Sequence, residues 1–126
     1  MKKILGIFLL VLVGCHQEPE VSVRPGQLVG TWNSLSASAS ATGKPFIRWT
    51  FDAEYVYTVD DTVKACQPVN STYFFTYWLE GDILVMRYAG ITNGLFPRPD
   101  RRRPIRSITA TELVLDEPRQ VLEKCP

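Results

Sequence analysis

The amino-acid sequence predicts an all-β domain, a small antiparallel meander that closes into a β-barrel of seven or eight strands. Short runs rich in Val, Ile, Thr, Tyr, Phe and Trp follow one another after residue 27, and Gly, Pro, Asp and Asn separate them. This is the pattern of strands joined by tight turns. No stretch shows the apolar spacing of a helix. Curling such a meander into a barrel removes its exposed edges, so we expect a closed sheet.

The first half of the domain is expected to form strands over residues 28–35, 46–52 and 55–60. A Ser- and Ala-rich loop follows the first strand, and a short polar turn joins the second to the third. In the second strand Ile47, Trp49 and Phe51 share one face, while polar residues occupy the other. This alternation is typical of a strand with one buried face.

The second half is expected to form strands over residues 72–80, 83–88, 105–109, 112–116 and 119–124. Gly81 supplies the positive φ that a short hairpin turn requires, and Pro118 separates the last two strands. Along 72–80 aromatic side chains occupy both faces. Only one face can point into a small barrel, so the other must be covered or form an exposed apolar patch.

The first 14 residues are expected to be a cleaved signal peptide: two lysines, an unbroken apolar run over 4–13, and Gly14 before Cys15. The run is shorter than the about 20 apolar residues of a membrane-spanning helix. The string Leu12-Val13-Gly14-Cys15 resembles the lipobox of bacterial lipoproteins, in which the cysteine is acylated and becomes the first residue of the mature protein. The alternative is an ordinary signal peptide followed by a chance cysteine.

Residues 15–26 are polar and contain two prolines and a glycine, so we expect a flexible tether between the lipid on Cys15 and a domain over 27–126. The anchor predicts a protein of the cell envelope, held through its acyl groups at the outer membrane and facing the periplasm. His16 is consistent with this, because it is not the aspartate that retains lipoproteins at the inner membrane in enteric-type bacteria.

Lipidation of Cys15 leaves Cys66 and Cys125 in a compartment where disulfides persist, which predicts a bond between them. A loop of that length, once closed, stabilises a small domain by roughly 4 kcal/mol in the chain-entropy model. The alternative is a pair of reduced, buried thiols.

Charge and side-chain chemistry argue against several classes of function. The formal net charge is +1, and removal of the two signal lysines leaves the chain close to neutral, which does not favour nucleic-acid binding. The only histidine, His16, lies in the tether, where no preorganised site can hold it. No Cys and His spacing indicates zinc, and the acidic pairs fall at turns. We therefore expect no catalytic role, no metal and no cofactor.

The residues Gly30-Thr31-Trp32 open the first strand and resemble the glycine-x-tryptophan signature of lipocalin domains. The resemblance implies that the Trp32 indole closes the base of the barrel. It also implies that a basic residue of the last strand stacks on Trp32, for which Arg119 is the match. The chain is shorter than classical lipocalins and has no C-terminal helix pattern, so an unrelated small barrel or sandwich is the alternative.

The resemblance further implies non-covalent binding of a small apolar ligand. The aromatic residues expected to line its cavity are Trp49, Phe51, Tyr57, Phe75 and Tyr77. An interior filled by side chains is the alternative, with the outward aromatics shielded by the loop over 36–45. The competing function is a protein-binding or structural envelope module, such as the small disulfide-bonded barrel lipoproteins that inhibit lysozymes.

A Pro- and Arg-rich segment over 97–106 is the second candidate binding feature. Its three prolines are expected to keep it extended and to prevent it from pairing as a central strand. Its basic side chains could contact anionic lipid head groups, an acidic partner or an anionic group of a ligand, at about 1 kcal/mol per residue near a membrane surface. The alternative is a solvated loop. These side chains are Arg98, Arg101, Arg102, Arg103 and Arg106.

Overall fold

The computed structural model describes residues 23–36, 43–90 and 98–126. The predicted signal peptide, Cys15, His16, most of the tether and the centre of the Ser- and Ala-rich loop lie outside the described residues. Within the described residues there is no helix of the length and hydropathy that a membrane crossing requires.

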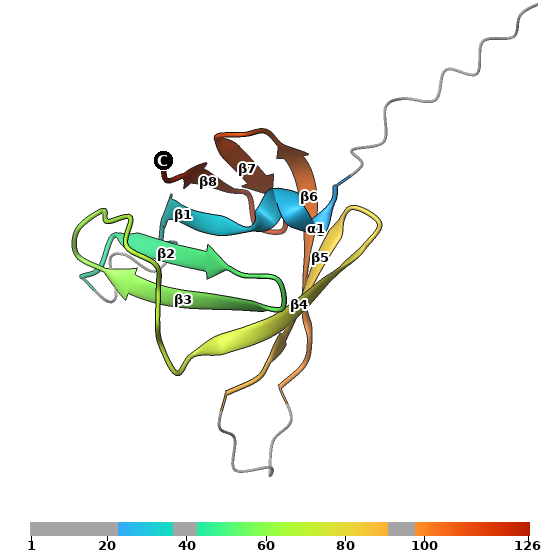
Figure 1. The fold of residues 1–126 in the computed structure, drawn as a ribbon, viewed down its shortest axis with the longest axis horizontal. Coiled ribbons are helices and arrows are strands. Elements are labelled where there is room, and N and C mark those ends of the chain that lie inside the picture. Colours follow the sequence, from blue (N-terminus) through green and yellow to red (C-terminus); the bar gives the residue numbers. More distant parts are fainter. Residues whose placement is uncertain (1–22, 37–42, 91–97) are drawn as a thin grey trace, which may run out of the picture.

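Eight antiparallel strands form a closed barrel in which every strand pairs with its neighbours in sequence, and β8 pairs with β1 (Figure 1). This confirms the predicted fold class. The strands are β1 (Gly30–Leu35), β2 (Phe46–Phe51), β3 (Tyr55–Asp61), β4 (Phe74–Glu80), β5 (Ile83–Tyr88), β6 (Arg101–Ile108), β7 (Glu112–Leu115) and β8 (Gln120–Lys124).

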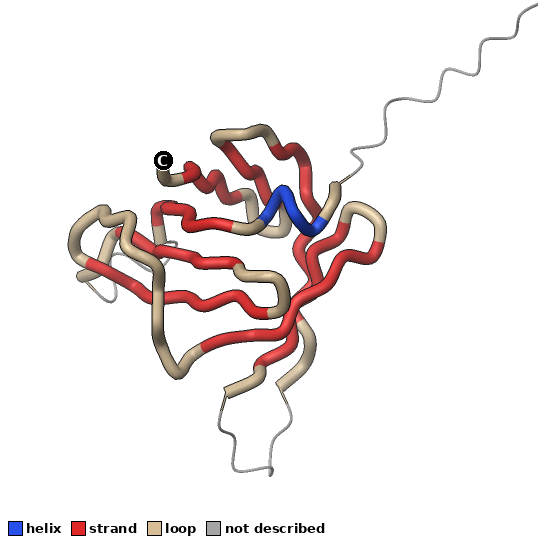
Figure 2. Tube along the Cα trace, in the orientation of Figure 1, coloured by secondary structure: helices blue, strands red, loops and turns tan. Residues whose placement is uncertain are grey.

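One short helix, α1 (Pro25–Leu28), precedes β1 and was not predicted (Figure 2). Pro25 stands in its first turn, where the missing N–H costs nothing, and the Arg24 backbone N–H donates to Gln27 Oε1 at 2.7 Å. With only four residues, α1 is too short to produce a helical pattern in the sequence. Helix α1 thus includes residues on both sides of the expected boundary at residue 27.

The Arg-rich segment is part of the barrel wall, which corrects the expectation that its prolines prevent central pairing. β6 begins at Arg101 and pairs with both β5 and β7. Pro104 lies opposite Ile83 of β5, just before the β6–β7 pairs begin. Its carbonyl accepts a hydrogen bond from the Asp116 N–H at 2.8 Å, so only the N–H donor of this residue is missing from the sheet.

The barrel end at which β1 begins is closed by packed side chains. Leu28 and Trp32 are completely buried there, and the Trp32 indole N–H donates to the Leu28 carbonyl at 2.9 Å. The basic residue over Trp32 is Lys124, whose Nζ lies 5.3 Å from the ring centroid. Arg119 is instead in the turn between β7 and β8, so the predicted match was wrong. We call this packed end the base.

Gly30 makes the approach of Lys124 possible. Its φ is +136°, in the region that favours glycine, and an added Cβ would lie 2.9 Å from Lys124 Cε. Gly30 thus leaves room for the Lys124 side chain, which lies over the Trp32 ring. Gly30 and Trp32 both hold the base of the barrel together.

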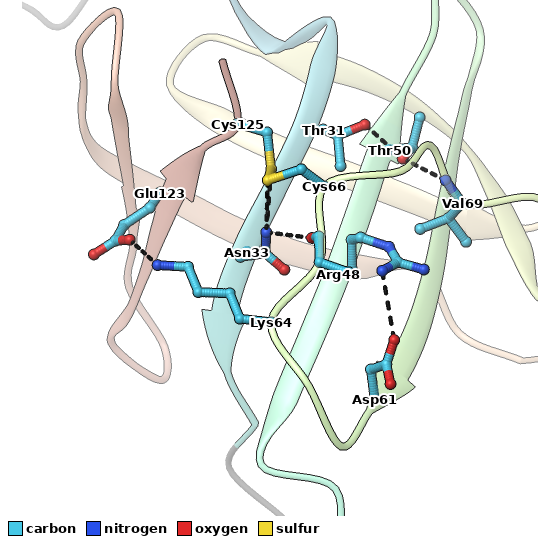
Figure 3. Close-up of a disulfide and its surroundings, with 11 residues drawn as sticks. Thr31, Asn33, Arg48, Thr50, Asp61, Lys64, Cys66, Val69, Glu123 and Cys125 are labelled. Atoms are coloured by element: carbon cyan, nitrogen blue, oxygen red, sulfur yellow. Dashed lines mark hydrogen bonds and ion pairs between the residues drawn. A yellow bond between two sulfur atoms is a disulfide. The ribbon is translucent and has the colours of Figure 1, made fainter.

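A disulfide joins Cys66 to Cys125, as predicted, with the Cα atoms 5.6 Å apart (Figure 3). It fastens the connection between β3 and β4 over the outer side of β1. Asn33 Nδ2 donates to the Ala65 carbonyl at 2.6 Å and to Cys125 Sγ at 3.1 Å. This cover explains why Asn33, which alternates with the inward Trp32, is only 3% exposed.

Candidate functional site

A cavity of about 690 Å³ occupies the barrel end opposite Trp32, where β1, β3, β5 and β7 end. Sites for small molecules typically have volumes of about 300–1,000 Å³. We call this end the mouth. The same eight strands form both ends of the barrel. The inward side chains fill the interior at the base and leave space between them at the mouth.

The floor of the cavity is apolar. It is formed by Ile47 and Trp49 from β2, Phe75 from β4 and Met86 from β5. Strand alternation turns these four side chains inward, and Trp49, Phe75 and Met86 are all buried. The Trp49 indole N–H has no hydrogen-bond partner among the described residues. Trp49 and Phe75 were predicted to line the cavity, and both do.

Phe51 and Tyr77 lie inside the barrel but do not line the cavity. Their rings meet edge to face at a centroid distance of 5.2 Å, deeper toward the base. The Tyr77 hydroxyl donates to the Asp52 backbone carbonyl. Burial, and then the charge of Asp52, raise the pKa of Tyr77 above its ordinary value, so this hydroxyl keeps its proton. Both residues fill the core.

Tyr57 lies on the outside of the barrel, so its predicted place in the cavity was wrong. Its neighbours Val56 and Thr58 take the inward positions of β3. Tyr57 stacks on Phe74 at a centroid distance of 5.3 Å, and Tyr55 packs against the same ring. Outward aromatic residues of β3 and β4 thus cover one another. We call Tyr55, Tyr57 and Phe74 the outer aromatic cluster.

Polar and charged side chains form the wall of the cavity above its floor. Arg101 and Arg103 come from β6, and Gln120 comes from the start of β8. Asp60 of β3 lines the cavity from another part of the barrel, separated from β6 in the sheet by β4 and β5. The cavity therefore combines an apolar floor with an unequal charge distribution around its wall.

Arg103 is held in place by neutral groups of the turn between β7 and β8. Its guanidinium donates to the carbonyls of Asp116 (3.2 Å) and Pro118 (2.7 Å) and to Gln120 Oε1 (3.1 Å). Burial, and then the nearby charge of Arg101, lower the pKa of Arg103, whereas Asp116 raises it. At neutral pH the side chain remains a cation, because the ordinary pKa of arginine is far higher.

Arg101 also has neutral partners only. Its guanidinium carbon lies 5.3 Å from the Phe75 ring centroid, and Nη2 donates to the Tyr73 hydroxyl at 3.3 Å. The side chain therefore lies against the aromatic part of the floor.

The five arginines predicted to act together do not form one surface. Arg102 and Arg106 are exposed and paired with Glu80 and Asp116, at 2.9 and 3.2 Å. Arg98 lies over the Tyr88 ring, 4.4 Å from its centroid. Of these five only Arg101 and Arg103 line the cavity, which Arg119 of the turn between β7 and β8 also lines. Pairing of β6 in the sheet separates the segment into inward and outward side chains.

Several cavity residues were missed by the sequence analysis. Those outside the strands are Ser36, Tyr73, Pro118 and Arg119, and those in the strands are Ser34, Leu35, Ile47, Thr58, Val59, Asp60, Met86, Gln120 and Val121. For Ile47 the signal was present, because it shares a face with Trp49. For the other strand residues, alternation identifies two faces but does not say which one turns inward.

A second hollow, of about 300 Å³, lies outside the barrel between β1, β8 and the covering loop, and Lys64 and Glu123 pair at 2.6 Å beside it. Across the described ranges, no three His, Cys, Asp or Glu side chains gather in a way that could hold a metal ion. The mouth cavity is therefore the stronger candidate for a binding site.

Comparisons of the chain with protein-family models, with curated proteins and with solved structures find no match.

Proposed function

We propose that this chain is a lipid-anchored protein of the cell envelope whose barrel binds a small, largely apolar ligand without covalent chemistry. The observation that supports the binding role is the cavity of about 690 Å³ at the mouth, with its floor of Ile47, Trp49, Phe75 and Met86. An apolar floor beneath a polar wall is the usual composition of a small-molecule site. The anchor rests on the string over residues 12–15.

The anchor is tested by metabolic labelling with an alkyne-tagged palmitate in a bacterial host. Label is expected on the wild-type chain and not on Cys15→Ser, while Cys66→Ser retains it. Fractionation of the envelope then locates the labelled protein. Equal labelling of wild type and Cys15→Ser would refute the lipobox.

The cavity is tested with the neutral fluorophore N-phenyl-1-naphthylamine. Saturable binding is expected, with quenching of Trp49, the cavity tryptophan. Ile47→Trp fills the floor and is expected to abolish binding. Tyr57→Trp adds an indole outside the barrel and serves as the matched control. Absence of saturable binding by the wild type, or equal loss in both variants, would count against a carrier.

The second candidate function is a protein-binding or structural envelope module, and the outer aromatic cluster supports it. Tyr55, Tyr57 and Phe74 are half-buried and contribute aromatic surface to the outside of the barrel. Aromatic residues are enriched at protein interfaces. Native mass spectrometry of the protein purified from its envelope separates the two functions, because a stoichiometric protein partner supports the module. Inhibition of lysozyme by the purified protein would favour it further.

A further inference from the structure

Arginines of β6 and β5 that face outward have acidic partners. Arg102 meets Glu80 at 2.9 Å, and Arg87 forms two hydrogen bonds of 3.0 Å with the Asp100 carboxylate. Arg106, at the bulge of β6, contacts Asp116. These pairs are exposed, where an unpaired arginine would cost little. The chain nevertheless supplies each of them with a carboxylate.

The arginines of β6 that face the cavity form no ion pair with a described residue, although the charge of Asp116, which pairs with Arg106, acts on Arg103 from nearby. Arg101 and Arg103 stand two residues apart on one face, so their side chains leave the strand about 7 Å apart. Their contacts are carbonyls, an amide oxygen, a hydroxyl and an aromatic ring, all neutral. Arg103 is half-buried, where a cation without a close counter-ion is costly, whereas Arg101 is exposed; two like charges at this distance also repel.

Arg103 also has donor capacity left over. A guanidinium has five N–H donors, and three hydrogen bonds account for three of them. The turn between β7 and β8 positions the group through two backbone carbonyls, so its place does not depend on a charged partner. The fixed fork can therefore bind an anion in the cavity at small cost in side-chain ordering.

We propose that the ligand of the mouth cavity is an amphiphile whose anionic group, a carboxylate or a phosphate, is held by Arg101 and Arg103. Its apolar part lies against Trp49, Phe75 and Met86. This inference rests on the proposed function, because it assigns a chemical class to the ligand of the same cavity. The missing counter-ion of the two arginines is then supplied by the ligand.

The position of Asp60 gives the site a direction. Asp60 lines the cavity from β3, and it forms no ion pair with another described residue. An anionic group is repelled there and attracted to the β6 side. Docking of the Arg-rich segment on an anionic membrane surface is less favoured, because its outward residues Arg102 and Arg106 already pair with acidic side chains.

The test compares three ligands with the same twelve-carbon tail: dodecanoate, dodecyl phosphate and 1-dodecanol. Each displaces N-phenyl-1-naphthylamine from the purified protein. Both anions are expected to bind at least about tenfold more tightly than the alcohol, the effect of one hydrogen-bonded charge. Inorganic phosphate, added alone, is expected not to compete at millimolar concentration. Competition at the affinity of dodecyl phosphate would mean a free-anion site and would overturn the amphiphile.

The decisive test compares two double variants that each remove two positive charges, one from the inward face of β6 and one from its outward face. Arg101→Gln with Arg103→Gln is expected to weaken dodecanoate at least about tenfold and to leave 1-dodecanol unchanged. The outward pair Arg102→Gln with Arg106→Gln is the matched control and is expected to leave both unchanged. Arg101→Gln alone keeps the test valid if loss of Arg103 prevents folding. Asp60→Asn is expected to tighten dodecanoate or leave it unchanged, and weaker binding would overturn the simple anion site.

Failure of this inference differs from failure of the proposed function. If dodecanoate and 1-dodecanol bind equally well to the wild type and the inward variant, the anionic group is refuted and the apolar carrier stands. If neither displaces the fluorophore, or the fluorophore itself does not saturate, the carrier is refuted as well. Binding of dodecanoate to vesicle-free protein also excludes a need for a membrane surface.

Discussion

The two ends of this barrel are built from the same eight strands but differ in how their polar groups are satisfied. At the base, the Trp32 indole N–H has a carbonyl partner and Lys124 lies over its ring. At the mouth, Arg101 and Arg103 have neutral partners only, and the Trp49 N–H has none among the described residues. One end is complete within the chain, and the other leaves charge and donors available.

The base therefore contributes mainly to stability, and the mouth is the end available for binding. A side chain that is fully packed and hydrogen-bonded contributes to the free energy of unfolding, whereas an uncompensated charge beside a cavity contributes to recognition at some cost in stability. Substitutions at the base should therefore change unfolding, and substitutions at the mouth should change binding.

Trp32→Ala should produce the largest loss. Trp32 is completely buried at the base, and removal of a buried tryptophan costs about 3–5 kcal/mol in the free energy of unfolding. Urea denaturation followed by circular dichroism measures it. A loss below about 1 kcal/mol would show that the base does not carry the stability of the barrel.

Replacement of both bonded cysteines, Cys66→Ser with Cys125→Ser, should cost about 4 kcal/mol. The bond spans 59 residues, so its loss releases a long loop in the unfolded chain. Urea midpoints with and without reductant measure the effect. Reductant is expected to destabilise the wild type and not the double variant. Equal sensitivity of both proteins would contradict the prediction.

Gly30→Ala should cost about 2 kcal/mol, because a β-carbon at this φ is strained and meets Lys124. Gly81→Ala is the matched control, since Gly81 also has a positive φ but no atom lies within 4 Å of an added Cβ. The difference between the two losses isolates the contact with Lys124. Adding Lys124→Ala should relieve part of the Gly30→Ala loss and none of the Gly81→Ala loss.

Tyr77→Phe should cost about 1 kcal/mol near neutral pH, because the hydrogen bond to the Asp52 carbonyl is lost. The folded state raises the pKa of Tyr77. Its contribution is therefore complete below the unfolded pKa and is lost as pH rises through the folded pKa. Urea midpoints in alkaline buffers should fall less steeply for Tyr77→Phe than for the wild type. Identical slopes would contradict this assignment.

Arg101→Gln should change the free energy of unfolding least, within about 0.5 kcal/mol. Loss of the contacts with Phe75 and Tyr73 is offset by relief of repulsion with Arg103. Thermal and urea unfolding of the variant and wild type measure the difference. A loss comparable to that of Trp32→Ala would show that the mouth is a stability element too.

Much of the fold followed from local patterns. The strand over 83–88 was predicted with the bounds it has, and the other strands differ by a few residues at their ends. The start of β6 was missed because a proline such as Pro104 argues against pairing. Pro104 lies just outside the β6–β7 pairs, which begin at Ile105 and Leu115, and the sequence does not show this register. Helix α1 was missed because four residues carry no period.

The candidate site was predicted only in part, for a related reason. Of the five aromatic residues expected in the cavity, Trp49 and Phe75 line it, Phe51 and Tyr77 fill the core, and Tyr57 lies outside. Alternation places residues on two faces but does not say which face turns inward when both are apolar. Depth along the barrel then decides between cavity and core.

The strand order and the cysteine pair could be predicted from the sequence, because each depends on local pattern or on residue type, whereas the closing role of Trp32 was implied by the resemblance to the lipocalin signature. The sequence also supplied the charges of the Arg-rich segment. Only the tertiary structure decided that Arg101 and Arg103 face the cavity while Arg102 and Arg106 meet acids outside. The physical reason is register: pairing of β6 with β5 determines which side chains point inward, and a shift by one residue would exchange the two sets.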